Sequence, residues 1–153
     1  MGDLERYLDE IVEPTIEDLR QNPTSVRHAF LACVVVFHSI DYLTFPKSSR
    51  GVRQKFRIQS REFAVVEHVA HAFKHVAAGK PARPHLTASE VIRRPPAFWG
   101  VMEWGLSRWG DPTGGVTLDR ARDVDLLETV TRATEFFRKQ TNRLQRRGPR
   151  RRE

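Results

Sequence analysis

The residues best suited to do chemistry are histidines and carboxylates in the central part of the chain. His38 and Asp41 lie three apart in an apolar segment, and His68, His71 and His75 follow one another at spacings of three and four. On a helix, such spacings place side chains on one face. A carboxylate beside an imidazole can orient it for acid–base chemistry, or the pair can be a structural polar link. The spacing predicts a polar network of His38, Asp41, His71 and His75.

The surroundings of His38 and Asp41 determine how buried they should be. Residues 26–45 are apolar in nearly every direction around a helix, a pattern typical of a buried helix. A buried carboxylate must be paired or hydrogen-bonded. We therefore expect both residues to be at least partly buried and to meet the polar side chains of the next helix, among them Arg61 and the three histidines named above.

The histidine stripe also has the spacing of a metal site. His71 and His75 are four apart, close enough to share one metal ion. The chain lacks the Glu-x-x-His pairs of di-iron bundles, however, and an ordinary solvated helix face explains the stripe as well. We predict no metal and no cofactor.

Four helices are expected to position these residues, because apolar side chains recur at helical spacings along four segments. Their ranges are 3–20, 26–45, from 53 or 56 to 78, and 123 to about 144. Pro14 should interrupt the first helix, Thr24 or Ser25 can cap the second, and Gly79 is a suitable C-cap for the third. Helices joined by short links pack together, so the sequence predicts an all-α, four-helix antiparallel bundle.

Residues 80–120 form an insertion between the third and fourth helices, and they are rich in proline and glycine. The segments around Trp99–Leu106 and Val116–Leu118 flank a glycine pair, which favours a small β-hairpin in an otherwise irregular stretch. This insertion also holds all the tryptophans of the chain. Near arginines they could stack bases, but we expect them to pack on the bundle as a lid.

The net charge of +7 is concentrated at the C-terminal end. The chain has 26 basic and 19 acidic residues; the eight basic and one acidic residue after position 137 leave 18 of each sign in residues 1–137. Such a tail binds any polyanion through counterion release, or it is only a solvated terminus. The residues assigned to nonspecific nucleic-acid contact are Arg146, Arg147, Arg150, Arg151 and Arg152.

Length and composition limit the class of protein. A chain of 153 residues has room for one domain, here residues 1–145, followed by a basic tail, residues 146–153, expected to be disordered. A single cysteine, Cys33, excludes an internal disulfide framework and a zinc site built from several thiolates. There is no run of 18 uncharged apolar residues, and the start of the chain is acidic, unlike a secretory signal. We expect a soluble cytoplasmic protein without a membrane span.

Three segments resemble a known group of proteins. They are Arg27–Ala32, Phe37–Leu43 and Val69–Val76. These segments, together with the order of the expected helices over about residues 5–140, resemble those of uncharacterised bacterial proteins with HEPN-like helical bundles. The resemblance implies that the four-helix bundle is of the HEPN-like type.

The resemblance also implies an activity and a partner. Many HEPN proteins are ribonucleases of toxin–antitoxin and phage-defence systems that act as dimers through an Arg-x4–6-His motif, and Arg61 and His68 have six residues between them. His68 would be a general base on a ribose 2′-hydroxyl, and Arg61 would stabilise charge on the phosphate, without a metal. The two lie about 10 Å apart along a helix, so a homodimer would have to complete the site. Glu62 departs from this pattern, because its charge disfavours a phosphate.

Two functions remain. The leading hypothesis is a binding or structural role in which the His/Asp network links helices; the alternative is a HEPN-like ribonuclease or RNA-binding protein. Whether the chain is an enzyme is left open. The nuclease requires Arg61 and His68 to be exposed in one cleft, whereas the binding role allows them to lie apart.

Overall fold

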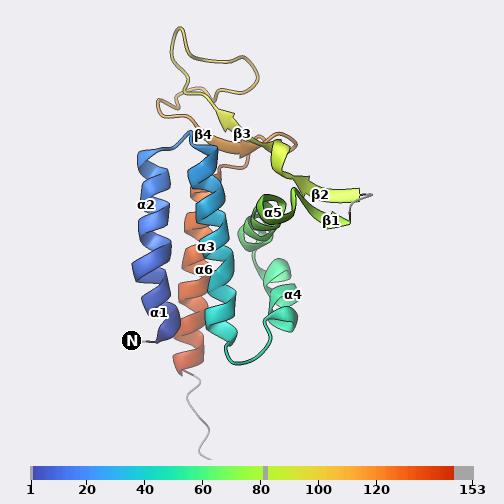
Figure 1. The fold of residues 1–153 in the computed structure, drawn as a ribbon. Helices are drawn as coiled ribbons and strands as arrows, with labels where there is room; N and C mark the ends of the chain where they lie inside the picture. Colours follow the sequence, from blue (N-terminus) through green and yellow to red (C-terminus); the bar gives the residue numbers. More distant parts are fainter. Residues whose placement is uncertain (1, 81–82, 147–153) are drawn as a thin grey trace, which may run out of the picture.

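The computed structural model describes residues 2–80 and 83–146, and this part of the chain is predominantly helical (Figure 1). The helices are α1 (Asp3–Tyr7), a π-helix (Leu8–Val12), α2 (Glu13–Gln21), α3 (Val26–Thr44), α4 (Arg50–Gln59), α5 (Arg61–His75) and α6 (Leu126–Arg146). Two small antiparallel sheets lie between α5 and α6. The predicted helical class is confirmed.

The α3 helix is the centre of the packing. It contacts α2, α5 and α6, and Figure 1 shows α1–α2 on one side of it and α4 on the other. By length and composition alone α3 could cross a membrane, but the same is true of the core helix of a soluble protein. Its fully buried apolar residues, Ala29, Ala32, Cys33, Val36 and Ile40, follow helical spacing along one face, and the fully buried Ser39 lies at the edge of that face, so α3 is buried on one side rather than all round.

Local signals explain how the first helices begin and continue. Pro14 lies in the first turn of α2, where its missing N–H is tolerated, and a π-helical turn, Leu8–Val12, precedes it. The helix is therefore interrupted near Pro14 but not broken. Ser25 caps α3 by accepting a hydrogen bond from the backbone N–H of His28 at 3.3 Å. Burial raises the pKa of Cys33 to about 12, as befits a core residue and not a nucleophile.

The prediction of one third helix that ends near residue 78 is wrong in two respects. The structure has two helices, α4 and α5, in this range, and α5 ends at His75. Ser60 has an extended backbone (φ −141°, ψ 115°) that separates α4 from α5, and its hydroxyl accepts from the N–H of Phe63 at 3.0 Å. Phe56 and Phe63 still meet edge to face across the break, with ring centroids 5.7 Å apart. At its other end α5 stops at His75, and its C-cap is Val76, in the left-handed conformation, rather than Gly79.

The insertion has more strand than expected, and its pairing differs. β1 (Ala77–Lys80) pairs with β2 (Arg83–Thr87), and β3 (Val91–Arg94) pairs with β4 (Gly115–Leu118). Gly79 thus belongs to a strand. Residues 116–118 are a strand as predicted, but residues 99–106 are not its partner. They lie in the long loop between β3 and β4, which projects beyond the helices in Figure 1.

A buried arginine holds this loop to the bundle. The side chain of Arg94 is 4% exposed and donates to Asp111 at 2.9 Å and to Asp125, just before α6, at 2.7 Å. Asp111 also accepts from the backbone N–H of Gly114 at 3.0 Å. A Cβ on Gly115 would lie 2.7 Å from the Arg94 guanidinium, so glycine is needed there for the close approach.

We expect Arg94→Met to destabilise the fold by about 3–5 kcal/mol, because it leaves two carboxylates facing each other without their shared cation. Arg93→Met is the matched control: that side chain is 58% exposed and pairs weakly with Glu103, so its loss should cost less than about 1 kcal/mol. Urea unfolding of both variants measures the difference. Equal losses would show that the Arg94 cluster does not anchor the loop.

Candidate functional site

His38 and Asp41 pair with each other but are not buried. Nδ1 of His38 lies 3.0 Å from Oδ2 of Asp41, and the two side chains are 53% and 52% exposed. The expected burial is wrong because the buried face of α3 is the one that carries Val36 and Ile40, while this pair projects from another side. Solvent screens such a pair, so it contributes little stability.

The surroundings of Asp41 belong to the first helix and not to α5. Tyr7 stacks on Tyr42 at 4.0 Å between ring centroids, and its hydroxyl donates to the carbonyl of Val35 at 3.0 Å. Burial, with added repulsion from Tyr42 and Asp41, raises the pKa of Tyr7 to about 12. Hydrogen bonds and ion pairs within residues 2–80 do not link Asp41 to His71, so that part of the predicted network is not formed.

His38 and His71 nevertheless both pack near one ring, that of Phe37. Their rings lie 5.5 Å and 5.2 Å from the ring of Phe37, centroid to centroid. The guanidinium carbon of Arg53 lies 5.2 Å from the same ring, a cation–π contact. One phenyl ring therefore gathers polar groups from α3, α4 and α5.

Next to this ring is a buried ion pair that the sequence analysis missed. The side chain of Glu67, on α5, is 1% exposed. Arg57 donates to both of its carboxylate oxygens, one of them at 2.7 Å, and Nε of Arg53 lies 3.7 Å from Oε1. The hydrogen bond to Glu67 raises the pKa of Arg57. The sequence did contain a signal for this ion pair. Glu67 lies on the apolar stripe of its helix, in register with Phe63 and Ala70, and a carboxylate at such a position needs a basic partner.

The two arginines that hold Glu67 belong to a basic segment without acidic residues. From Tyr42 to Arg61 the chain has six basic residues and no acidic one. They are Lys47, Arg50, Arg53, Lys55, Arg57 and Arg61. We call the side chains of Arg50, Arg53, Lys55 and Arg57, with His71 beside the arginines, the α4 face. The three arginines share one side of the helix and Lys55 lies about 140° round the axis from Arg50; Arg50, Lys55 and Arg57 are exposed.

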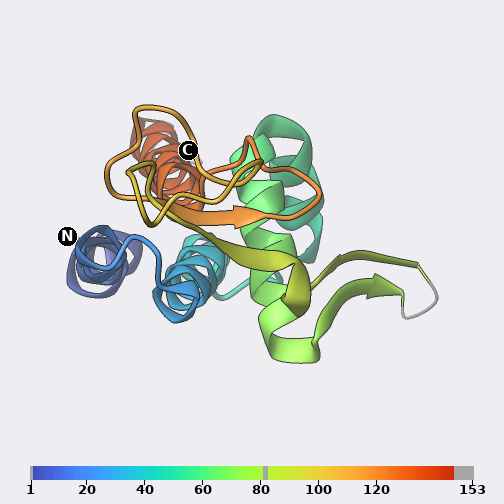
Figure 2. The same ribbon diagram turned by 90° about the horizontal axis from the view of Figure 1, so that it is seen from above.

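The opposite side of the molecule carries the opposite charge. Residues 3–21 have seven carboxylates and two arginines. The carboxylates are Asp3, Glu5, Asp9, Glu10, Glu13, Glu17 and Asp18. Figure 2, seen from above, shows this blue helix and the green α4 at opposite sides of α3. The neutrality of residues 1–137 therefore hides a segregation of charge.

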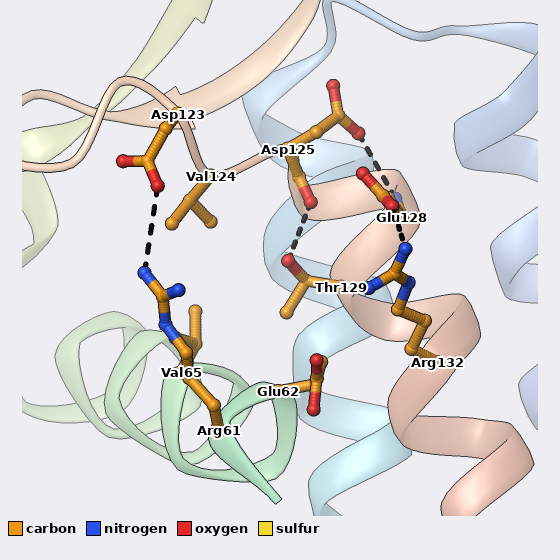
Figure 3. A pocket seen from close by; sticks show the side chains of 9 residues that line it. All are labelled: Arg61, Glu62, Val65, Asp123, Val124, Asp125, Glu128, Thr129 and Arg132. Carbon is orange, nitrogen blue, oxygen red and sulfur yellow. Dashed lines mark hydrogen bonds and ion pairs between the residues drawn. The ribbon is translucent and has the colours of Figure 1, made fainter.

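Arg61 lies in acidic surroundings. Its side chain is 75% exposed and lies 3.7 Å from Asp123, in a pocket of about 120 Å³ between α5 and α6 (Figure 3). Four carboxylates line this pocket: Glu62, Asp123, Asp125 and Glu128. The second arginine there, Arg132, pairs with Glu128. Such a pocket repels a phosphate.

His68 does not line the pocket that holds Arg61. It is half-buried, and its ring stacks on that of His85 at 5.3 Å. Burial, and then repulsion from His85, lowers the pKa of His68. Within one chain, the pocket that holds Arg61 is therefore formed without His68, and this geometry lends no support to their joint action on a phosphate.

The rest of the histidine stripe offers no metal cage. The rings of His71 and His75 lie 6.2 Å apart. Within the part of the chain that the structure describes, no group of three or more His, Cys, Asp or Glu side chains could hold a metal ion. Burial lowers the pKa of His71, and the positive charge of Arg53 acts in the same direction.

The tryptophans do not pack as a lid: Trp99, Trp104 and Trp109 are 95%, 84% and 81% exposed.

Of the basic tail, Arg146 is the last residue of α6. Arg147, Arg150, Arg151 and Arg152 lie outside the described residues.

Comparison with protein-family models, with curated proteins and with solved structures gives no match for this chain.

The lowered pKa values of His68 and His71 predict a loss of stability in mild acid. An unfolded histidine titrates near pH 6.5, so below about pH 6.5 the unfolded chain binds more protons than the folded one. Stability is full above that pH and falls as pH drops through the lower folded pKa values. We expect the melting temperature to fall between about pH 7 and about pH 5, above the range in which carboxylates titrate.

His68→Gln should remove part of this dependence. His75→Gln, at an exposed position on the last turn of α5, is the control and should retain most of it. A melting temperature that stays constant over this range in the unmodified protein would contradict the prediction.

Proposed function

We propose that this protein binds nucleic acid, RNA in particular, and that the α4 face contacts the phosphate backbone. The observation that carries the proposal is the acid-free segment from Tyr42 to Arg61, in which the exposed side chains of Arg50, Lys55 and Arg57 stand on one helix, α4. Phosphate contacts by such side chains release counterions and supply most of the affinity for nucleic acid. A basic cluster on a folded face is the usual electrostatic footprint of this function.

The buried ion pair supports the proposal because it gives α4 a fixed orientation. Glu67 neutralises part of the charge of Arg53 and Arg57 but leaves Arg50 and Lys55 with no acidic residue near them in sequence. The acidic helices on the far side of α3 would repel a phosphate backbone and so direct it to the α4 face.

The same proposal includes three further points: a bundle of the HEPN-like type, RNA rather than DNA as the ligand, and a cytoplasmic location. The first two are supported by the three segments that resemble HEPN-like proteins and by the predominantly helical fold. The location is proposed because the chain has a single cysteine, as is common in a reducing compartment. Homodimerisation and RNA cleavage would follow from that resemblance as well. The acidic pocket around Arg61 favours binding over cleavage.

The test is the salt dependence of binding to a fluorescent single-stranded RNA of about 20 nucleotides. In Arg50→Gln/Lys55→Gln, two exposed charges are lost, and the slope of log K against log salt should fall by about 0.7 for each phosphate contact removed. The matched control is Arg6→Gln, which removes an exposed charge from the acidic side and should leave the slope unchanged.

A chain that ends at Arg146 separates the α4 face from the tail. It should bind more weakly than the full chain but still respond to the α4 substitutions. If removal of residues 147–153 abolishes binding, or if the α4 variant has the slope of the unmodified protein, the α4 face is not the contact surface.

A further inference from the structure

The loop between β3 and β4 displays its tryptophans in a repeated pattern. Trp99, Trp104 and Trp109 are each followed by glycine, so a Trp-Gly pair recurs every five residues. The three glycines, Gly100, Gly105 and Gly110, have φ values of 84°, 74° and 76°, which favour glycine. Each tryptophan therefore precedes a turn and is presented to solvent. Exposed large apolar side chains gathered in one place mark an interaction site.

The loop that carries these indoles is tied down from within. The backbone N–H of Ala97 donates to the carbonyl of Asp111 at 2.8 Å, close to the Arg94 cluster. Arg122 donates to the carbonyl of Gly105 at 2.9 Å, and Arg108 donates to the carbonyl of Arg122 at 2.9 Å. These contacts hold the middle and both ends of the loop, which lowers the entropy lost when a ligand binds.

The charges near the loop are largely paired. Arg122 lies 2.8 Å from Asp119, and Arg93 lies 4.0 Å from Glu103. The buried arginine, Arg94, is already held by two carboxylates. The loop therefore offers flat apolar surface rather than a strong electrostatic field.

We propose that the three Trp-Gly turns form a second contact site, at which the indoles stack on unpaired bases of a single-stranded nucleic acid. This inference rests on the proposed function. Trp104 and Trp109 meet edge to face, with centroids 6.3 Å apart and planes at 72°, and their high exposure leaves most of each ring open. Stacking on aromatic side chains contributes about 1–3 kcal/mol per base and needs no particular sequence.

A single strand is the ligand that fits both surfaces of this molecule. It offers phosphates to the α4 face and open base faces to the indoles, whereas in a duplex the base faces are covered by their neighbours. The loop projects from one end of the helices, and α4 lies beside the other half of α3 (Figure 1). The α3 helix is about 29 Å long, and even a fully stacked strand of about 20 nucleotides, at about 3.4 Å per nucleotide, exceeds that distance.

The experiment measures binding of the full chain to oligo(U) and oligo(dT) of about 20 nucleotides and to a duplex of the same length. Trp104→Ala and Trp109→Ala should each weaken binding to the single strands by about fivefold or more. Because an indole makes no phosphate contact, the salt slope should stay that of the unmodified protein. Val101→Ala, on the same loop but aliphatic, is the control and should bind normally.

Tryptophan fluorescence gives a second measurement. The single strands should quench it and the duplex should not, and circular dichroism should show that each variant keeps its helices. The inference is overturned if the tryptophan variants bind as tightly as the unmodified protein, if the duplex quenches equally, or if neutral phospholipid vesicles change the fluorescence and oligo(U) does not. If the α4 variant loses binding and the tryptophan variants do not, the proposed function stands but the tryptophan site does not. If the unmodified protein binds none of the oligonucleotides, both the proposed function and the tryptophan site are overturned.

Discussion

The buried carboxylate of Glu67 is the constraint on which the position of α4 depends. An ionised carboxylate that is 1% exposed would cost several kcal/mol without partners. Both of its partners, Arg53 and Arg57, come from α4, so satisfying one charge on α5 fixes the neighbouring helix and its rotation. The aromatic contact of Phe56 with Phe63 holds the same pair of helices from the apolar side. With α4 fixed in this way, Arg50 is left on the exposed part of the helix.

Charge segregation and the projecting loop place a basic surface and an aromatic surface on different parts of the molecule. The acidic N-terminal helix and the basic α4 lie on opposite sides of α3, so a polyanion has one side to approach. The β3–β4 loop, held by Arg94, carries exposed aromatic surface with paired charges. The basic side chains and the exposed indoles thus lie on different elements, and each set can be altered by substitution without the other.

Much of the helical frame could be predicted from the sequence, because long amphipathic segments and a cap such as Ser25 are local signals. The break at Ser60 could not: Phe56 and Phe63 lie seven residues apart, about two helical turns, so the apolar pattern continues in register through one non-helical residue. The pairing of β3 with β4 joins segments about 20 residues apart, and no local pattern specifies such pairing. The basic segment from Tyr42 to Arg61 is visible in the sequence, but a total charge of zero over residues 1–137 does not show it, because such a sum does not say where each sign lies. Glu67, a carboxylate on the apolar stripe of α5, could have indicated that the neighbouring basic segment supplies its partners.

Hydrogen–deuterium exchange on the whole chain, with and without a single-stranded RNA of about 20 nucleotides, tests most directly where the ligand lies. We predict that RNA slows exchange in residues 47–61 and 98–110 and leaves residues 3–21 unchanged. Protection confined to residues 3–21, or to the tail after Arg146, would contradict the assignment of the α4 face as the contact surface.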